Sequence, residues 1–399
     1  MKIKDKIKLA YLVTHPIHYQ SPLLKRIASE PDIDLVVFYQ SDCSLRKHFD
    51  VEFGRTIDWG VPLLEGFSYR FLPSIGGNDT LSYLRPFNVG LGRFLRAGKF
   101  DALIIHGYNR PYHWAAILLC KILKISVFIR DEATLISRKR SLIKRLFKRL
   151  FFGLLKHLVE GFLSIGTANA QYYISNGIPK ELIFSTPYAV DNVFFSNHVK
   201  AAAKRRADFR KQLNLEPGRP IVLYASKLQV RKRALDLFDA FKLAFDSIRP
   251  SPYLLYVGDG ELKPALLKRM ESVNNDSVRF YGFCSQTELP AFYELCDVFV
   301  LASLFETWGL VVNEAMNAGK AIIVSDQVGA GVDLVKDGDN GYIVPAGNVG
   351  ALADSLVKVL ADPVECGRMG MRSAEIIAGW NYDKDVAGIR QALGLKDYP

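Results

Sequence analysis

Short runs of β-branched and aromatic residues alternate along the chain with longer stretches of helical character. This alternation is typical of parallel sheets whose strands are joined by crossover helices. The strands predicted in the first half are Leu9–Val13, Leu35–Tyr39, Ala102–His106, Ser126–Ile129, Phe162–Ile165 and Ile183–Thr186, with helices at Trp114–Lys124 and Ala168–Ser175. The strands predicted in the second half are Ile221–Ala225, Tyr253–Val257, Val278–Tyr281, Val298–Ala302 and Ala321–Val324.

Between the two series lies Asn197–Lys211, a polar and basic segment without strand character. It is interpreted as an interdomain linker that runs into a helix. The sequence therefore predicts an α/β protein with two Rossmann-like, doubly wound domains, residues 1–196 and 197–378, facing a central cleft. Residues 379–399 are expected to form a helix that packs back on the first domain. A length of 399 residues fits this division.

The amino-acid composition adds little to this picture, but the net charge points to a class of partner. The formal net charge is +11, which implies an anionic partner: nucleic acid, a membrane surface or a phosphorylated substrate. The apolar run Leu9–Val13 is too short for a signal peptide, and no spanning stretch of about 18 apolar residues occurs, so a cytoplasmic protein is expected. Five separated cysteines without a CxxC pair predict free thiols, not a zinc site or disulfide framework.

The stretch from Leu301 to Lys320 carries the most chemistry. It predicts a strand, a tight turn holding Glu306, and a helix that begins near Gly309 and contains Glu314. The amino terminus of such a helix is a ready site for a diphosphate. About 12 Å of helical rise would let the two carboxylates address opposite ends of one elongated ligand. The alternative is that Glu306 caps the helix and Glu314 is solvated.

The wider segment from Asp297 to Asp326 resembles the Glu-x7-Glu region of the retaining glycosyltransferases of family 4, also called group 1, which have the GT-B fold. Asp337–Pro345 is similar to the same family. Matching stretches cover most of residues 220–360, with weaker similarity from about residue 100 to 195. The resemblance implies a hexosyltransferase that uses a nucleotide diphosphate sugar.

By the same resemblance, Glu306 faces the transferred sugar and Glu314 the ribose. Glu306 is interpreted as a sugar-positioning and electrostatic group, not a nucleophile, because the retaining mechanism implies front-face attack. No metal or other cofactor is expected, since GT-B enzymes generally need none. The residues between and beside the two glutamates that we expect to bind the donor are Thr307, Trp308, Gly309 and Leu310.

A second motif, Ser226–Arg233, is similar to the Gly-Arg-Leu-x-x-x-Lys-Gly motif of that family. Its two basic residues hold the donor diphosphate and correspond here to Lys227 and Lys232. Lys227 replaces an arginine and lacks its bidentate fork, so Arg231 or Arg233 could share the role. A solvated basic turn is the alternative. After another predicted strand, Phe283 follows a glycine in the turn that lies beside the nucleotide base in the family.

Acceptor-side candidates come from the first half. His15 and His18 follow the first strand, where family members often carry a Gly-rich loop that this chain lacks. Either histidine could contact the acceptor or be structural. His106 occupies a place where similar enzymes have a histidine facing the donor sugar, so it is a catalytic candidate.

Three charged residues follow the next strand. Asp131 or Glu132 could bind acceptor hydroxyls or take the proton. Arg130 could contact the acceptor as well, or pair structurally with these carboxylates.

The segment from Arg138 to Leu158 holds eight Lys/Arg residues and no acid. Its apolar residues recur at three- and four-residue spacing, which predicts a basic amphipathic helix suited to an anionic membrane surface. A lipid-linked acceptor would explain it; the alternative is a domain helix with a charged outer face. Because its aromatic residues are spaced like a core face, nucleic-acid binding is disfavoured.

The leading hypothesis is a retaining hexosyltransferase acting on a glycan or lipid-linked acceptor, in cell-surface polysaccharide biosynthesis and peripheral to the inner face of the membrane. Two alternatives stay open: a nucleotide-sugar epimerase or hydrolase with the same fold, and a non-catalytic binder of membrane surfaces.

Overall fold

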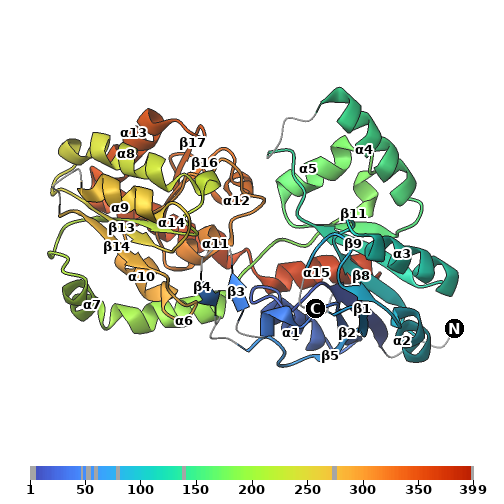
Figure 1. Ribbon diagram of the computed structural model, residues 1–399. Helices are drawn as coiled ribbons and strands as arrows, with labels where there is room; N and C mark the ends of the chain where they lie inside the picture. Colours follow the sequence, from blue (N-terminus) through green and yellow to red (C-terminus); the bar gives the residue numbers. More distant parts are fainter. Residues whose placement is uncertain are drawn as a thin grey trace. The chain divides into compact units, whose positions relative to one another are not determined.

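The computed structural model describes residues 6–45, 62–77, 81–136, 141–271 and 276–396, together with the backbone of 48–50 and 55–57. It divides into two compact units (Figure 1). Unit 1 comprises Met1–His48, Val61–Tyr188 and Tyr382–Pro399, and unit 2 comprises Phe49–Gly60 and Ala189–Asn381. Each unit has its own parallel sheet, so each is described by itself.

Unit 1 is built on a seven-stranded sheet in the order β11-β10-β9-β8-β1-β2-β5, with every neighbouring pair parallel. Apolar clusters lie on both faces of this sheet, as expected for a doubly wound unit. The strands are β1 (Ile7–Val13), β2 (Ile33–Tyr39), β5 (Ser68–Phe71), β8 (Ala102–His106), β9 (Ser126–Asp131), β10 (Gly161–Ser164) and β11 (Ile183–Ser185). The helices are α1 (Ser21–Ala28), α2 (Leu91–Gly98), α3 (Pro111–Leu123), α4 (Leu142–Leu155), α5 (Thr167–Ser175) and α15 (Tyr382–Ala392).

Unit 2 is built on a six-stranded parallel sheet in the order β14-β13-β12-β15-β16-β17. The strands are β12 (Ile221–Ala225), β13 (Tyr253–Val257), β14 (Val278–Gly282), β15 (Val298–Leu301), β16 (Ala321–Ser325) and β17 (Gly341–Val344). The helices are α6 (Asn192–Ala203), α7 (Arg206–Gln212), α8 (Ala234–Ala244), α9 (Lys263–Glu271), α10 (Leu289–Leu295), α11 (Leu310–Asn317), α12 (Gly329–Leu334), α13 (Val349–Leu360) and α14 (Pro363–Ala378).

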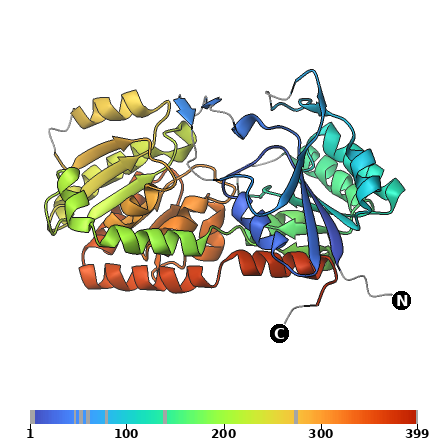
Figure 2. The same ribbon diagram turned by 90° about the horizontal axis from the view of Figure 1, so that it is seen from below.

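The last helix, α15, belongs to unit 1 although it follows unit 2 in the chain. It packs against α1, β10 and β11, and Figure 2 shows it beneath that sheet. Two buried arginine pairs fasten it: Arg130 of β9 with Asp385, at 2.6 Å, and Arg390 with Glu30, also at 2.6 Å. Because both pairs are nearly excluded from water, α15 is an integral part of unit 1.

The segment Asn197–Lys211, predicted as a linker leading into a helix, is mostly helical in α6 and α7. The chain passes between units at Tyr188 and Ala189, ahead of the boundary predicted at residue 196. The reason is packing, because α6 lies against α10 and α11 of unit 2. In the part of the chain that the structure describes, no helix is both long and apolar enough to cross a membrane.

Candidate functional site

The donor motifs of unit 2 meet at one edge of its sheet. The loops that follow β12, β13, β14, β15 and β16 all start where those parallel strands end. Close approach of two loops requires Gly258, which has φ +140°, because a Cβ there would clash with the carbonyl oxygen of Ser226. Ligands of doubly wound sheets bind at this edge, which makes it the candidate donor site.

Lys232, Arg231 and Glu306 form a charged cluster at this edge. The Lys232 ammonium contacts Glu306 Oε2, and the Arg231 guanidinium lies 3.4 Å from the same oxygen. Burial lowers the pKa of Lys232, and the Glu306 carboxylate offsets part of that effect. Lys232 and Arg231 come from the 3₁₀ turn after β12, Val230–Lys232, and Glu306 from the loop after β15. Two cations thus converge on one carboxylate that lies where an anionic ligand is expected to bind.

The other basic residues of the motif behave differently. Arg233 has φ +56° and donates to Asp236 at 2.6 Å, away from the cluster with Glu306. The left-handed backbone explains why the resembled motif has glycine here. The backbone of Lys227 is held by the Tyr224 hydroxyl, which donates to its carbonyl at 2.8 Å. Of the two arginines considered for the diphosphate, Arg231 is therefore the better placed.

Glu314 lies on α11 and is buried, with 7% of its surface exposed. Its Oε2 accepts a hydrogen bond from the Tyr293 hydroxyl at 2.7 Å. Burial raises the pKa of Glu314 to about 7, and the bond from Tyr293 lowers it only in part. Burial therefore makes this carboxyl group easier to protonate than a glutamate in water. The sequence pattern did not single out Tyr293 as its partner.

The turn between the two glutamates is shaped by packing. Gly309 has φ +100°, and a Cβ there would lie 3.0 Å from a Leu301 methyl group, so only glycine fits comfortably. Trp308 is buried, stacks on Trp380 with ring centroids 5.6 Å apart, and donates to Asn313 at 2.9 Å. Trp308 therefore supports the turn from beneath. The remaining predicted donor residues, Thr307, Leu310 and Phe283, are half-buried.

In unit 1, His106 sits at the end of β8 in a polar network. Its Nδ1 lies 3.1 Å from the Gln20 amide nitrogen, and its Nε2 lies 3.9 Å from Glu132 Oε1. The same Glu132 oxygen accepts from the Tyr188 hydroxyl at 2.6 Å and from Tyr19 at 3.3 Å. Glu132 keeps 34% of its side chain exposed. A carboxylate and an imidazole, both accessible, are thus held side by side.

Arg130 and Asp131 are occupied inside unit 1. Both Arg130 terminal nitrogens bind the Asp385 carboxylate, at 2.9 and 2.6 Å. Asp131 accepts from Tyr173 and from Asn169, and burial raises its pKa. The acceptor role predicted for these two residues stays a prediction. Glu132, weighed with them, is the more accessible carboxylate.

His15 and His18 lie in the loop between β1 and α1, and both are half-buried. His15 Nδ1 is 2.9 Å from the Thr14 hydroxyl, and the His18 ring meets Tyr19 edge-on at 5.5 Å. Through Tyr19, His18 is one residue removed from the Glu132 network. Their acceptor role stays a prediction.

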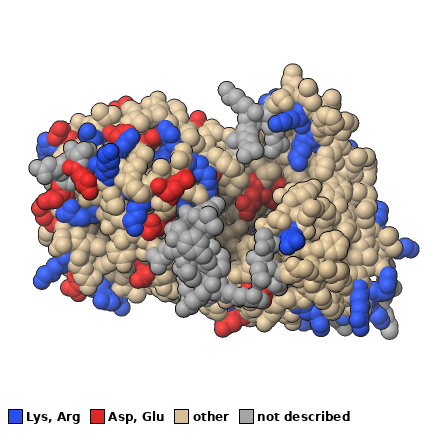
Figure 3. Space-filling model, viewed as in Figure 1, with Lys and Arg blue, Asp and Glu red and all other residues tan. Residues whose placement is uncertain are grey.

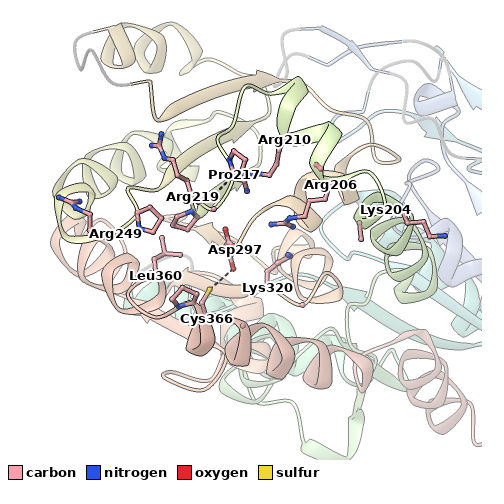
Figure 4. A pocket seen from close by; sticks show the side chains of 18 residues that line it. Lys204, Arg206, Arg210, Pro217, Arg219, Arg249, Asp297, Lys320, Leu360 and Cys366 are labelled. Carbon is pink, nitrogen blue, oxygen red and sulfur yellow. Dashed lines mark hydrogen bonds between the residues drawn. The ribbon is translucent and has the colours of Figure 1, made fainter.

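A cavity of about 620 Å³ lies at the opposite edge of the unit 2 sheet. Its lining includes Pro220, Asp297 and Lys320, which precede strands β12, β15 and β16. Figure 4 shows Asp297 and Lys320 among the side chains that line it. Two of its charged groups have internal partners: Lys320 donates to the carbonyl of Glu294 at 2.7 Å, and Asp297 accepts from the backbone of Ile221. The cavity is therefore separate from the candidate donor site.

Comparison with known proteins shows which family the carboxyl-terminal part of the chain is similar to. Residues 205–375 match the family model described as glycosyl transferases, group 1. This match contains β12 to β17 and both charged motifs. This part of the chain is therefore similar to the group 1 glycosyl transferases.

Two relatives and one solved structure are similar to longer parts of the chain. The chain is 28% identical over 224 residues to the alpha-D-kanosaminyltransferase of Streptomyces kanamyceticus, covering 55% of this chain and 56% of that protein. The chain thus spans about half the length of that relative. It is 22% identical over 381 residues to the N,N'-diacetylbacillosaminyl-diphospho-undecaprenol alpha-1,3-N-acetylgalactosaminyltransferase of Campylobacter jejuni, covering 94% and 93%. Anabaena HepE, solved with UDP, superposes with a TM-score of 0.72 at 17% identity, covering 98% and 99%, so the fold is GT-B.

Proposed function

We propose that this glycosyltransferase is a retaining hexosyltransferase, which moves a hexose from a nucleotide diphosphate sugar to a glycan or lipid-linked acceptor. The observation that carries the donor class is the cluster of Lys232 and Arg231 on Glu306 at the carboxyl edge of the sheet. HepE, which shares the fold, has been solved with UDP-glucose, and this supports a nucleotide sugar here. The Campylobacter relative acts, by its name, on a sugar attached to diphospho-undecaprenol, which supports a lipid-linked acceptor.

In the proposed donor complex the diphosphate takes over the cations that now contact Glu306. Lys227, Lys232 and Arg231 balance the charge that develops on the leaving diphosphate, so no metal ion enters the proposal. Glu306, released from part of its pairing, accepts from hydroxyls of the transferred sugar. Glu314 accepts from the ribose hydroxyls.

The reaction breaks the bond between the anomeric carbon and the diphosphate oxygen and forms a bond from that carbon to the acceptor oxygen on the same face. The leaving phosphate oxygen takes the acceptor proton. No covalent enzyme intermediate is formed. His106 keeps the catalytic role that the resemblance implies, and Glu132 is proposed as an acceptor-hydroxyl ligand alongside it.

We place the reaction in cell-surface polysaccharide biosynthesis, at the inner face of the membrane. The test is to incubate the protein with UDP-, GDP-, ADP- and dTDP-hexoses and to follow transfer or slow hydrolysis. Turnover of one donor that Glu306→Gln lowers by about a hundredfold or more supports the proposal.

Other products would identify the alternatives. Isomerised nucleotide sugar without acceptor would indicate an epimerase. Full biological activity of Glu306→Gln would indicate a non-catalytic binder. Proton NMR of the product tests the stereochemistry, because a retaining enzyme conserves the anomeric configuration of the donor.

A further inference from the structure

Helix α4 (Leu142–Leu155) turns large apolar side chains toward solvent. Six of them are between 59% and 80% exposed. They are Leu142, Ile143, Leu146, Phe147, Leu150 and Leu154, and together they are called the α4 apolar face. Contiguous exposed apolar surface of this kind marks a contact with a membrane or another macromolecule.

The α4 apolar face is on the opposite side of the helix from its packing side. At about 100° per residue, the six side chains cover an arc of about 140°. Phe152 and Leu155, the two buried residues of α4, project about 180° from the middle of that arc. The outer surface of the helix is therefore apolar, and the charged outer face considered from the sequence is absent from the described helix.

The carboxyl-terminal half of α4 is firmly attached to unit 1. Phe151 packs on Trp114 of α3 with ring centroids 5.2 Å apart, and it also meets Tyr108 at 5.5 Å. Lys148 lies over the rings of Tyr108 and Phe151, at 4.6 Å from each. The apolar face therefore cannot be buried by a simple rotation of the helix without giving up these contacts. The neighbouring α3 also leaves Leu118 and Ile122 exposed.

The charged residues of α4 itself are all Lys or Arg. From Ser141 to Leu158 the chain carries five Lys/Arg residues and no Asp or Glu. In Figure 3 the upper part of unit 1, where α4 lies, shows Lys and Arg side chains and no acidic ones. The three further basic residues of the predicted segment, 138–140, lie outside the described residues.

We propose that the α4 apolar face inserts into an anionic lipid surface, with its basic residues on the lipid headgroups. This rests on the proposed function in that the surface carries the lipid-linked acceptor. An amphipathic helix binds such a surface through buried apolar area together with attraction to anionic lipid. A second copy of the chain is the disfavoured occupant, because it would bring like charges together around the contact.

The test is cosedimentation of the full chain with two kinds of vesicle. One consists of phosphatidylcholine alone, and the other contains about 30% phosphatidylglycerol, which supplies anionic headgroups. We expect binding to the anionic vesicles, weakened by salt. The double variant Leu146→Ser/Phe147→Ser should weaken it by about tenfold or more. Its matched control is Val364→Ser/Met371→Ser, which alters two apolar residues of α14 that are 81% and 65% exposed, against 61% and 69% for Leu146 and Phe147. This control should bind as the unaltered chain does.

A second variant reports insertion directly. Phe147→Trp should show a blue-shifted indole emission on anionic vesicles and quenching by lipids brominated in the acyl chain. Equal binding by the Leu146→Ser/Phe147→Ser variant, or no binding by the unaltered chain, would overturn the proposal. A dimer of the unaltered chain that the Leu146→Ser/Phe147→Ser substitutions dissociate would also overturn the proposal. Because vesicle binding needs no donor, failure of the proposed glycosyl transfer would not alter this readout.

Discussion

Glu314→Gln should remove a pH dependence of stability that the buried carboxyl group creates. Burial raises the pKa of Glu314 from 4.5 to about 7. In the unfolded chain the group ionises near 4.5, so between these pH values the folded state binds the extra proton. Stability is therefore fully present below pH 4.5 and is lost as the pH rises through about 7.

The size of the effect follows from the two pKa values. Their separation corresponds to about 3 kcal/mol in total. Between pH 5 and pH 8 the two titration curves give a loss of roughly 2–3 kcal/mol. Glutamine is the right replacement, because its carbonyl oxygen can still accept the hydrogen bond from Tyr293, observed at 2.7 Å.

The assay is urea unfolding of both proteins at pH 5 and pH 8, followed by tryptophan fluorescence, since unit 2 contains the stacked pair Trp308 and Trp380. We expect the unfolding free energy of the unaltered chain to fall by roughly 2–3 kcal/mol more than that of the variant. Equal pH dependence of the two proteins would refute the reasoning. It would mean that Glu314 titrates normally in the folded state.

Three further predictions concern other residues. Arg233→Gly should be more stable than Arg233→Ala by about 1 kcal/mol in thermal unfolding, because the backbone is left-handed at φ +56°. Both variants lose the ion pair with Asp236, so the comparison isolates the backbone effect. Equal stability of the two variants would contradict this. Arg130→Ala should lower the free energy of unfolding in urea by about 3–5 kcal/mol, because it leaves Asp385 buried and unpaired. Unchanged stability together with a raised KM for the acceptor would instead indicate that Arg130 binds the acceptor. Glu132→Gln should lower kcat/KM for the acceptor by about tenfold or more with little change in donor affinity. An unchanged kcat/KM for the acceptor would exclude Glu132 as an acceptor ligand.

Much of the fold is predictable because the central strands are continuous apolar runs. Ile221–Ala225 and Tyr253–Val257 are buried along their whole length, and they form the strands predicted for them. The edge strands β5 and β17 were missed, because Ser68–Phe71 is largely exposed and Gly341–Val344 is buried only at its two ends. These two edge strands lack the continuous buried apolar run that marks the central strands.

The site is only partly visible in the sequence. Spacing alone could not bring Lys232 and Glu306 together, since they are 74 residues apart and meet only because β12 and β15 are neighbours in the sheet. The choice of Arg231 over Arg233 needed the backbone conformation after β12. Periodicity likewise showed that α4 is amphipathic, but not that its apolar side faces solvent, because a pattern of residues carries no information about which side packs.

The central claim is that the carboxyl edge of the unit 2 sheet binds a nucleotide diphosphate. It is tested most directly by calorimetric titration of UDP, GDP, ADP and dTDP into the unaltered chain, Lys232→Ala and the control Lys204→Ala, whose exposed lysine lines the cavity at the opposite edge. We expect one nucleotide to bind, Lys232→Ala to weaken it by about 10- to 100-fold, and Lys204→Ala to leave it unchanged. Binding that Lys232→Ala does not weaken, or no binding of any of the four, would contradict the account.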